Sequence, residues 1–161
     1  MTCLIEINRT TPSLGLLYEA ASRYRHCGAI CLVHAIASGR PAEVEAGQRV
    51  LGEAARALRR RDRDLSIEAR LEIGDTAEQL LRVAEEIQPA LIVMSAHGEG
   101  DFPRLRSLGR VAGETLARGC RPVLLVSPTG NKLFRPRRSG ARRRVAPSPQ
   151  ARSTVAQAAS P

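Results

Sequence analysis

The sequence is poor in aromatic side chains. Phenylalanine, tyrosine and tryptophan together make up 2% of the 161 residues, and tryptophan is absent. Proteins that bind single-stranded nucleic acid stack the bases on aromatic side chains, so this class of protein is disfavoured. Lysine is scarce as well, because Lys132 is the only lysine among 25 basic residues. Codon usage in a GC-rich genome is the first explanation for that imbalance.

Long apolar runs are also missing. The most apolar stretch, Ala90–Met94, is far too short to cross a bilayer. The first residues lack the charged segment, hydrophobic stretch and cleavage site of a secretion signal. We therefore expect a cytoplasmic protein whose cysteines are reduced and buried. The four cysteines are Cys3, Cys27, Cys31 and Cys120.

Acidic residues are absent from the last part of the chain. Residues 130–161 hold eight of the 25 basic residues and none of the 16 acidic ones, so the net charge of +9 lies almost entirely there. The sequence predicts a near-neutral domain over residues 1–128 and a disordered tail over residues 129–161, rich in Arg, Pro, Ser and Ala. A nucleic-acid-binding face within the domain is not expected. The arginines of the tail either bind nucleic acid or an anionic membrane through charge, or simply solvate the extension.

Apolar periodicity divides the first 128 residues into alternating strands and helices. Strands are expected at 2–7, 29–37, 65–73, 90–94 and 122–126. Helices are expected between them, beginning near Thr11-Pro12, at Pro41, at Asp75 with Glu78 in a capping box, and at Ser107. This order predicts an α/β fold with a mostly parallel sheet and helices on both faces. If the first and fourth strands are neighbours, a ligand crevice opens between Asn8–Thr11 and Ser95–Gly100.

The chain has no recognisable catalytic or metal-binding constellation. It contains no Gly-x-Ser-x-Gly elbow, and we expect no enzyme activity. His34 falls in a buried strand and is interpreted as a hydrogen-bonded core residue. His26, Cys27, Cys31 and His34 match no common zinc spacing, so no metal site is expected.

Residues 90–126 read ALIVMSAHGEGDFPRLRSLGRVAGETLARGCRPVLLV. This segment resembles the C-terminal half of the universal stress protein domain, and the upstream piece LEIGDTAEQLLRVAEEIQPALIVM fits the same pattern. The resemblance implies a five-stranded sheet in the order 3-2-1-4-5, a Rossmann-like fold of the adenine nucleotide alpha hydrolase type. It also implies a homodimer and, in some members, ATP binding. The dimer contact would be the last strand, through Val123, Leu124, Leu125 and Val126.

The nucleotide motif of ATP-binding members is altered in this sequence. Those members carry Gly-x2-Gly-x9-Gly-Ser/Thr, whereas this chain has Ser95-x2-Gly98-x10-Gly109-Arg110. Asn8 stands where the family has an adenine-contacting Asp. Arg110 either pairs with phosphate or fills the space that a smaller Ser leaves open. The contacts that the resemblance implies are Asn8, Ala35, Met94, Ser95, Gly98, Gly109, Arg110 and Val111.

Three hypotheses about function follow. The first is a non-catalytic universal stress protein-like regulatory module with a degenerate nucleotide site. The second is an ATP-binding, nucleotide-responsive member of the same family. The third is an adaptor that binds nucleic acid or an anionic membrane through its basic tail.

Overall fold

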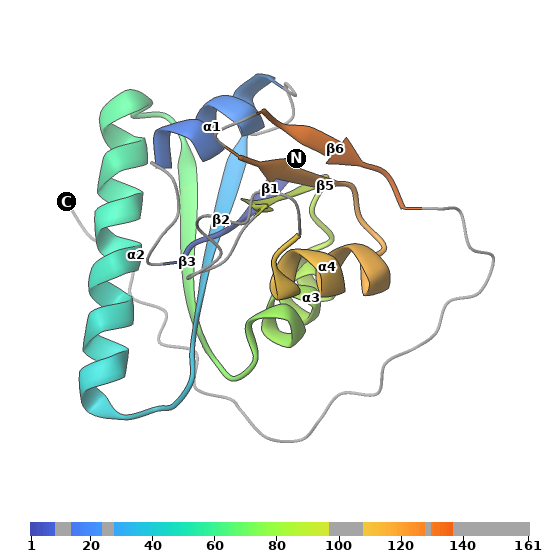
Figure 1. The fold of residues 1–161 in the computed structure, drawn as a ribbon. Coiled ribbons are helices and arrows are strands. Elements are labelled where there is room, and N and C mark those ends of the chain that lie inside the picture. Colours follow the sequence, from blue (N-terminus) through green and yellow to red (C-terminus); the bar gives the residue numbers. More distant parts are fainter. Residues whose placement is uncertain (9–13, 24–27, 97–107, 128–129, 137–161) are drawn as a thin grey trace.

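The computed structural model describes residues 1–8, 14–23, 28–96, 108–127 and 130–136. Strands and helices alternate through these residues until the last two elements, which are both strands (Figure 1). The elements are β1 (Thr2–Glu6), α1 (Leu14–Arg23), β2 (Ala29–Ile36), α2 (Pro41–Arg61), β3 (Ser66–Ile73), α3 (Thr76–Ile87), β4 (Leu91–Ser95), α4 (Arg110–Arg118), β5 (Val123–Val126) and β6 (Lys132–Phe134).

The sheet has the order β3-β2-β1-β4-β5-β6. The first five strands are parallel and follow the expected order 3-2-1-4-5. The expected number of strands was wrong, because β6 adds a sixth strand antiparallel to β5. Gly130 makes this return with a φ of 137°, a conformation that favours glycine. Residues 130–136, which we expected to be disordered, therefore extend the sheet, while residues 137–161 lie outside the described part.

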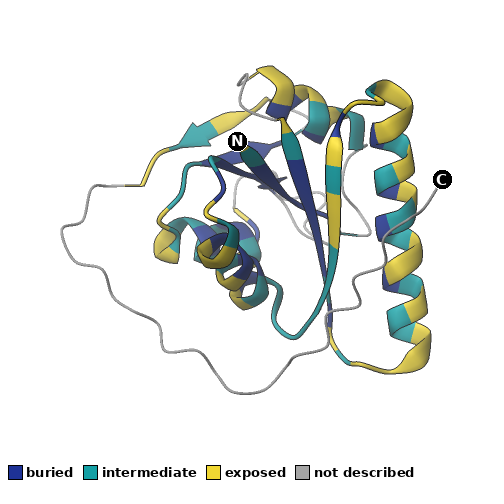
Figure 2. Ribbon diagram, turned by 180° about the vertical axis from the view of Figure 1, so that it is seen from behind, coloured by how far each residue is buried: buried dark blue, intermediate teal, exposed yellow. Residues whose placement is uncertain are grey.

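Helices cover both faces of the sheet, as the alternation predicted. One apolar cluster joins α1 and α2 to one face, through residues such as Leu17, Leu51 and Leu58. The other joins α3 and α4 to the opposite face, through residues such as Leu80 and Ala112. Figure 2 shows the central strands buried and the outer side of α2 exposed. Because the central strands carry apolar side chains toward both faces, their sequence is continuously apolar rather than alternating.

The two edges of the sheet are protected in different ways. At one edge, β3 alternates as expected: Ile67 and Leu71 pack toward α2, while charged side chains point toward α3. At the other edge, β6 covers β5, which we had expected to be the last strand and the free edge. β6 is short and carries Lys132, which is typical of an edge that resists pairing with other chains.

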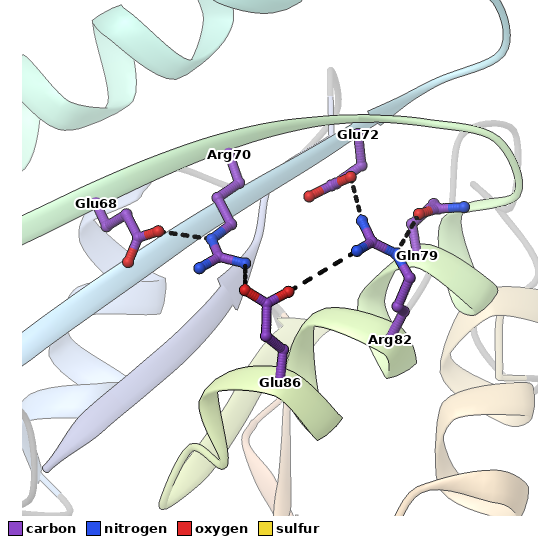
Figure 3. Close-up of polar contacts among 6 residues, drawn as sticks. All are labelled: Glu68, Arg70, Glu72, Gln79, Arg82 and Glu86. Carbon is purple, nitrogen blue, oxygen red and sulfur yellow. Dashed lines mark hydrogen bonds and ion pairs between the residues drawn. The ribbon is translucent and has the colours of Figure 1, made fainter. Parts of the chain in front are cut away.

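Charged side chains tie β3 to α3 (Figure 3). The guanidinium of Arg70 donates to Glu68 at 2.6 Å and lies 2.9 Å from a carboxylate oxygen of Glu86. Arg82 on α3 in turn pairs with Glu72 on β3 and with Glu86. Two arginines and three carboxylates therefore hold the edge strand to the helix that covers it.

The starts of α2 and α3 agree with the sequence prediction. Pro41 is the first residue of α2, and Asp75 caps α3 by accepting a hydrogen bond from the Glu78 amide at 3.1 Å. The start of α4 differs, because Gly109 is its N-cap. Thr11, Pro12 and Ser107, which we predicted as helix-start residues, lie outside the described residues.

The expectation of four reduced, buried cysteines was wrong. Cys3 is disulfide-bonded, and Cys120 is a free but exposed thiol. Among the described cysteines, only Cys31 is both free and buried, and burial raises the pKa of its thiol to about 12. A thiol with so high a pKa carries almost no thiolate at neutral pH and is unreactive.

Candidate functional site

The strand order reverses at β1, which lies between β2 and β4. In open parallel sheets, ligands bind beyond the carboxyl ends of the strands at such a reversal. Asn8 follows β1, Ala35 lies near the end of β2, and Ser95 ends β4. Pairing continues past the strands, because the Ile7 amide donates to the Val33 carbonyl at 2.8 Å. The fold thus brings these three predicted site residues to one edge of the sheet.

The start of α4 reaches the same edge. The Gly109 amide donates to the carbonyl of Ala96, directly after β4, at 3.0 Å. Gly109 is buried and has no side chain that could cap the helix. The first-turn amides of Arg110 and Val111 therefore have no side-chain acceptor on the N-cap residue. Unpaired first-turn amides and the positive end of the helix dipole attract anions.

Two of the predicted nucleotide contacts, Met94 and Ser95, are buried. Met94 is only 1% exposed and packs in the apolar cluster beneath α3 and α4. Ser95 is buried at the end of β4, where it already has a partner. Gly98 lies outside the described residues, as do His97 and the rest of the predicted phosphate loop. The edge therefore presents Asn8, Ala35 and the start of α4, with Met94 serving the core.

Arg110 is held by two carboxylates. One guanidinium nitrogen lies 2.7 Å from Asp75, the N-cap of α3, and another lies 2.7 Å from Glu114, one turn further along α4. The hydrogen bonds that Arg110 donates to Glu114 and Asp75 raise the pKa of its guanidinium. The Glu78 amide and then Arg110 hold the pKa of the Asp75 carboxyl below its usual value. Arg110 thus links the starts of α3 and α4.

Glu6 is a polar residue that the sequence analysis missed. It is only 4% exposed at the end of β1, and it pairs in register with Val33 of β2. Alternation along β1 places it on the same face as Leu4, toward α3 and α4, two residues before Asn8. Burial raises the pKa of its carboxyl group to about 7. The available signal was an acidic residue within the apolar run TCLIEI.

His34 is a structural residue, as we interpreted it. Its Nδ1 lies 2.7 Å from the carbonyl oxygen of Ile7, which only accepts hydrogen bonds, so Nδ1 carries the proton. Within the described ranges, no three His, Cys, Asp or Glu side chains are grouped to hold a metal ion. None of the helices described here is long and apolar enough to cross a bilayer.

The fold defines a class of protein: an open, mostly parallel α/β sheet whose strand order reverses at β1. The model of the universal stress protein family matches residues 7–127. The chain belongs to the universal stress protein family. No curated protein matches it.

Solved structures of universal stress proteins share this fold. One from Archaeoglobus fulgidus is 18% identical, with a TM-score of 0.64, and the match covers 79% of this chain and 98% of that one. The Archaeoglobus protein in complex with dAMP gives a TM-score of 0.61 at the same identity and the same coverage of both chains. An Arabidopsis thaliana family member with AMP bound is 15% identical, with a TM-score of 0.56, over 78% of this chain and 90% of that one.

Proposed function

We propose that this universal stress protein is a non-catalytic regulatory module with a degenerate nucleotide site, one that does not hold ATP tightly. The observation that carries the proposal is that the guanidinium of Arg110 is already ion-paired with Asp75 and Glu114. A phosphate at the start of α4 would have to displace one of these carboxylates. It would also face their negative charges at close range.

The carboxyl edge still has features that suit an adenine nucleotide. The start of α4 has no side-chain cap from its N-cap residue, and Asn8, which already has a partner in the fold, carries an amide of the kind that pairs with a base or ribose. The related structures with dAMP and AMP bound support a monophosphate as the ligand to test first. A ligand with fewer phosphate charges meets less repulsion from Asp75 and Glu114.

The first test is to denature the purified full chain and to identify the released nucleotide by mass spectrometry. Titration calorimetry with ATP and AMP then follows on the ligand-free protein. We expect no stoichiometric ATP and a weaker affinity for ATP than for AMP. Stoichiometric release of ATP, or tight ATP binding, would instead establish the second hypothesis, a nucleotide-responsive member.

A double variant tests the role of Arg110 directly. Asp75→Asn with Glu114→Gln removes both negative charges, and Asn still caps α3. The freed guanidinium should improve ATP affinity by about tenfold, the equivalent of about 1.4 kcal/mol. The matched control is Glu45→Gln with Glu53→Gln, which makes the same charge change on exposed positions of α2. Equal affinities in the two double variants would contradict the proposed role of Arg110.

The third hypothesis, an adaptor acting through the tail, concerns arginines outside the described residues. It is tested within the experiment described in the next subsection, where a tail variant serves as one arm.

A further inference from the structure

Four arginines line an open hollow at the end of α2. The hollow has a volume of about 360 Å³ and is lined by Arg56, Arg59, Arg60 and Arg63. Arg59 and Arg60 follow Arg56 by three and four residues, so these three side chains lie on one side of α2. Arg63 lies beyond the helix and is brought to the others by the turn before β3. We refer to these four residues as the arginine stripe.

The stripe is not neutralised by its surroundings. All four side chains are exposed, and none makes an ion pair with another described residue. Arg49, two turns earlier on the same helix, pairs with Glu45 at 3.1 Å. Asp62 and Asp64 flank Arg63 in the chain, but neither makes an ion pair with another described residue, and Asp62 accepts hydrogen bonds from the hydroxyl of Tyr18 and the amide of Asp64. The charge of the stripe is therefore available to an external anion.

Stabilisation of the helix end does not account for the whole stripe. Basic side chains in the last turn interact with the negative end of the helix dipole, and Arg59 and Arg60 lie in that turn. The dipole effect falls off within one turn, however, and Arg56 lies before the last turn while Arg63 lies after the helix. The two outer arginines need a different explanation.

The lining of the hollow indicates what kind of anion fits. Guanidinium groups match phosphate oxygens through paired hydrogen bonds. Only arginines line the hollow, so it offers no aromatic ring that would favour a nucleotide base over a phosphate. None of the large exposed apolar side chains, Met1, Leu16 and Leu108, lines it either, so the stripe has no apolar group to insert into a membrane. A backbone of repeated phosphates fits these features best.

We propose that the arginine stripe binds the phosphodiester backbone of double-stranded nucleic acid without reading its sequence. The three arginines on α2, Arg56, Arg59 and Arg60, span about 6 Å of helix length. One strand of a duplex carries a phosphate about every 3.4 Å along the axis, so phosphates recur on the same scale as these guanidinium groups. This surface is distinct from the nucleotide site. It lies at the end of α2 that leads into β3, on the side of the amino ends of the parallel strands, whereas the nucleotide site lies at their carboxyl ends.

The test measures fluorescence anisotropy of labelled DNA and RNA duplexes with the full chain, as a function of salt concentration. The variant R56Q/R59Q/R60Q/R63Q removes the stripe, and R40Q/R49Q/R118Q/R135Q removes the same charge from exposed positions elsewhere. We expect the stripe variant to bind at least tenfold more weakly near 0.1 M salt. The slope of log affinity against log salt should fall by about 0.9 for each lost contact. The control variant should stay within about threefold of the original chain.

A third variant, R137Q/R138Q/R142Q/R143Q/R144Q, separates the stripe from the tail. If only this variant loses binding, the tail carries the interaction and the proposal is wrong. The proposal also fails if the stripe and control variants bind equally, if no duplex binds at low salt, or if the stripe is needed only for anionic vesicles. DNA and RNA arms of equal strength would show that the shared phosphate backbone is the ligand.

Discussion

Single residues show how far an inference from the sequence reaches. Asp75 followed by Glu78 predicted a capped helix start, because the geometry of a cap depends on residues three apart in sequence. The partners of Arg110 were beyond prediction. Asp75 lies 35 residues away, and only the packing of α3 against α4 brings the two together. Whether the guanidinium of an arginine is free to pair with phosphate depends on such neighbours.

Glu6 is expected to make the stability of the protein depend on pH. Its folded-state pKa of about 7 lies above the ordinary value of 4.5. Below about pH 4.5 the carboxyl group is protonated in both the folded and the unfolded state, so its burial does not lower the free energy of unfolding through ionisation. As pH rises from there to about 7, the unfolded state ionises first, so the free energy of unfolding falls. The total loss is about 3 kcal/mol, reached above pH 7.

The variant Glu6→Gln should lack this loss. Relative to the original chain, it should gain stability steadily between pH 4.5 and 7 and no further above that. Urea denaturation followed by circular dichroism at several pH values measures the difference. Glu53→Gln, at an exposed position on α2, is the control. A constant offset between the Glu6→Gln and original curves across this range would show that Glu6 does not titrate as we expect.

At the scale of elements, the alternating sequence of β3 accounts for only one side of the ion-pair network between β3 and α3. Apolar and charged residues alternate along Leu65–Ile73, and the structure places Ile67 and Leu71 toward α2 and the charged side chains toward α3. The alternation did not predict that α3 would supply Glu86 and Arg82 as partners. Burial opposes the charge of Arg70, but the hydrogen bonds that it donates to Glu68 and Glu86 outweigh this effect, and the pKa of the guanidinium is raised.

Replacing Arg70 should loosen this edge of the sheet. The Arg70 side chain is 17% exposed, whereas Glu68 and Glu86 are more than half exposed and are screened by water. Arg70→Met leaves the carboxylates together without the cation between them. We expect the free energy of unfolding to fall by about 1–2 kcal/mol. The matched change Arg49→Met, in an exposed pair on α2, should cost no more than about 0.5 kcal/mol. Urea denaturation of both variants compares them, and equal losses would contradict a special role for Arg70.

At the scale of the whole molecule, β6 changes the expected surface. We expected β5 to be an open edge through which two copies pair, with Val123–Val126 in the contact. In the structure β6 pairs with β5, with Leu124 opposite Leu133, so the exposed edge on this side belongs to β6. Homodimerisation through this side of the sheet stays a prediction, and β6 would be the strand in contact.

Two shortened chains test whether β6 protects β5. A chain that ends after Pro136 keeps β6, and a chain that ends after Ser127 loses it. The first should match the full chain in melting temperature and in oligomeric state by light scattering. The second should leave the apolar edge of β5 uncovered and form larger species. If the two shortened chains have the same oligomeric state and melting temperature, β6 has no protective role.

The overall charge balance does not show how charge is distributed over the surface. From the near-neutral total over residues 1–129 we expected no nucleic-acid-binding face within the domain, and the duplex-binding experiment tests that expectation against the arginine stripe. The structure gathers Arg56, Arg59, Arg60 and Arg63 around one hollow, and none of the four makes an ion pair with another described residue. A net charge sums over all faces of a molecule, whereas a binding partner meets only one of them.

The sequence by itself determined the α/β class and the family resemblance, and the resemblance in turn implied the order of the five parallel strands. The class and the resemblance depend on local apolar periodicity, on caps and on a short glycine-containing motif, all of which act between residues close in the chain. The tertiary structure alone decided the pairing of β6, the carboxylates that hold Arg110, the burial of Glu6 and the grouping of the arginine stripe. Each of these depends on which distant segments pack together, because burial and charge neighbours exist only once the helices and strands are assembled.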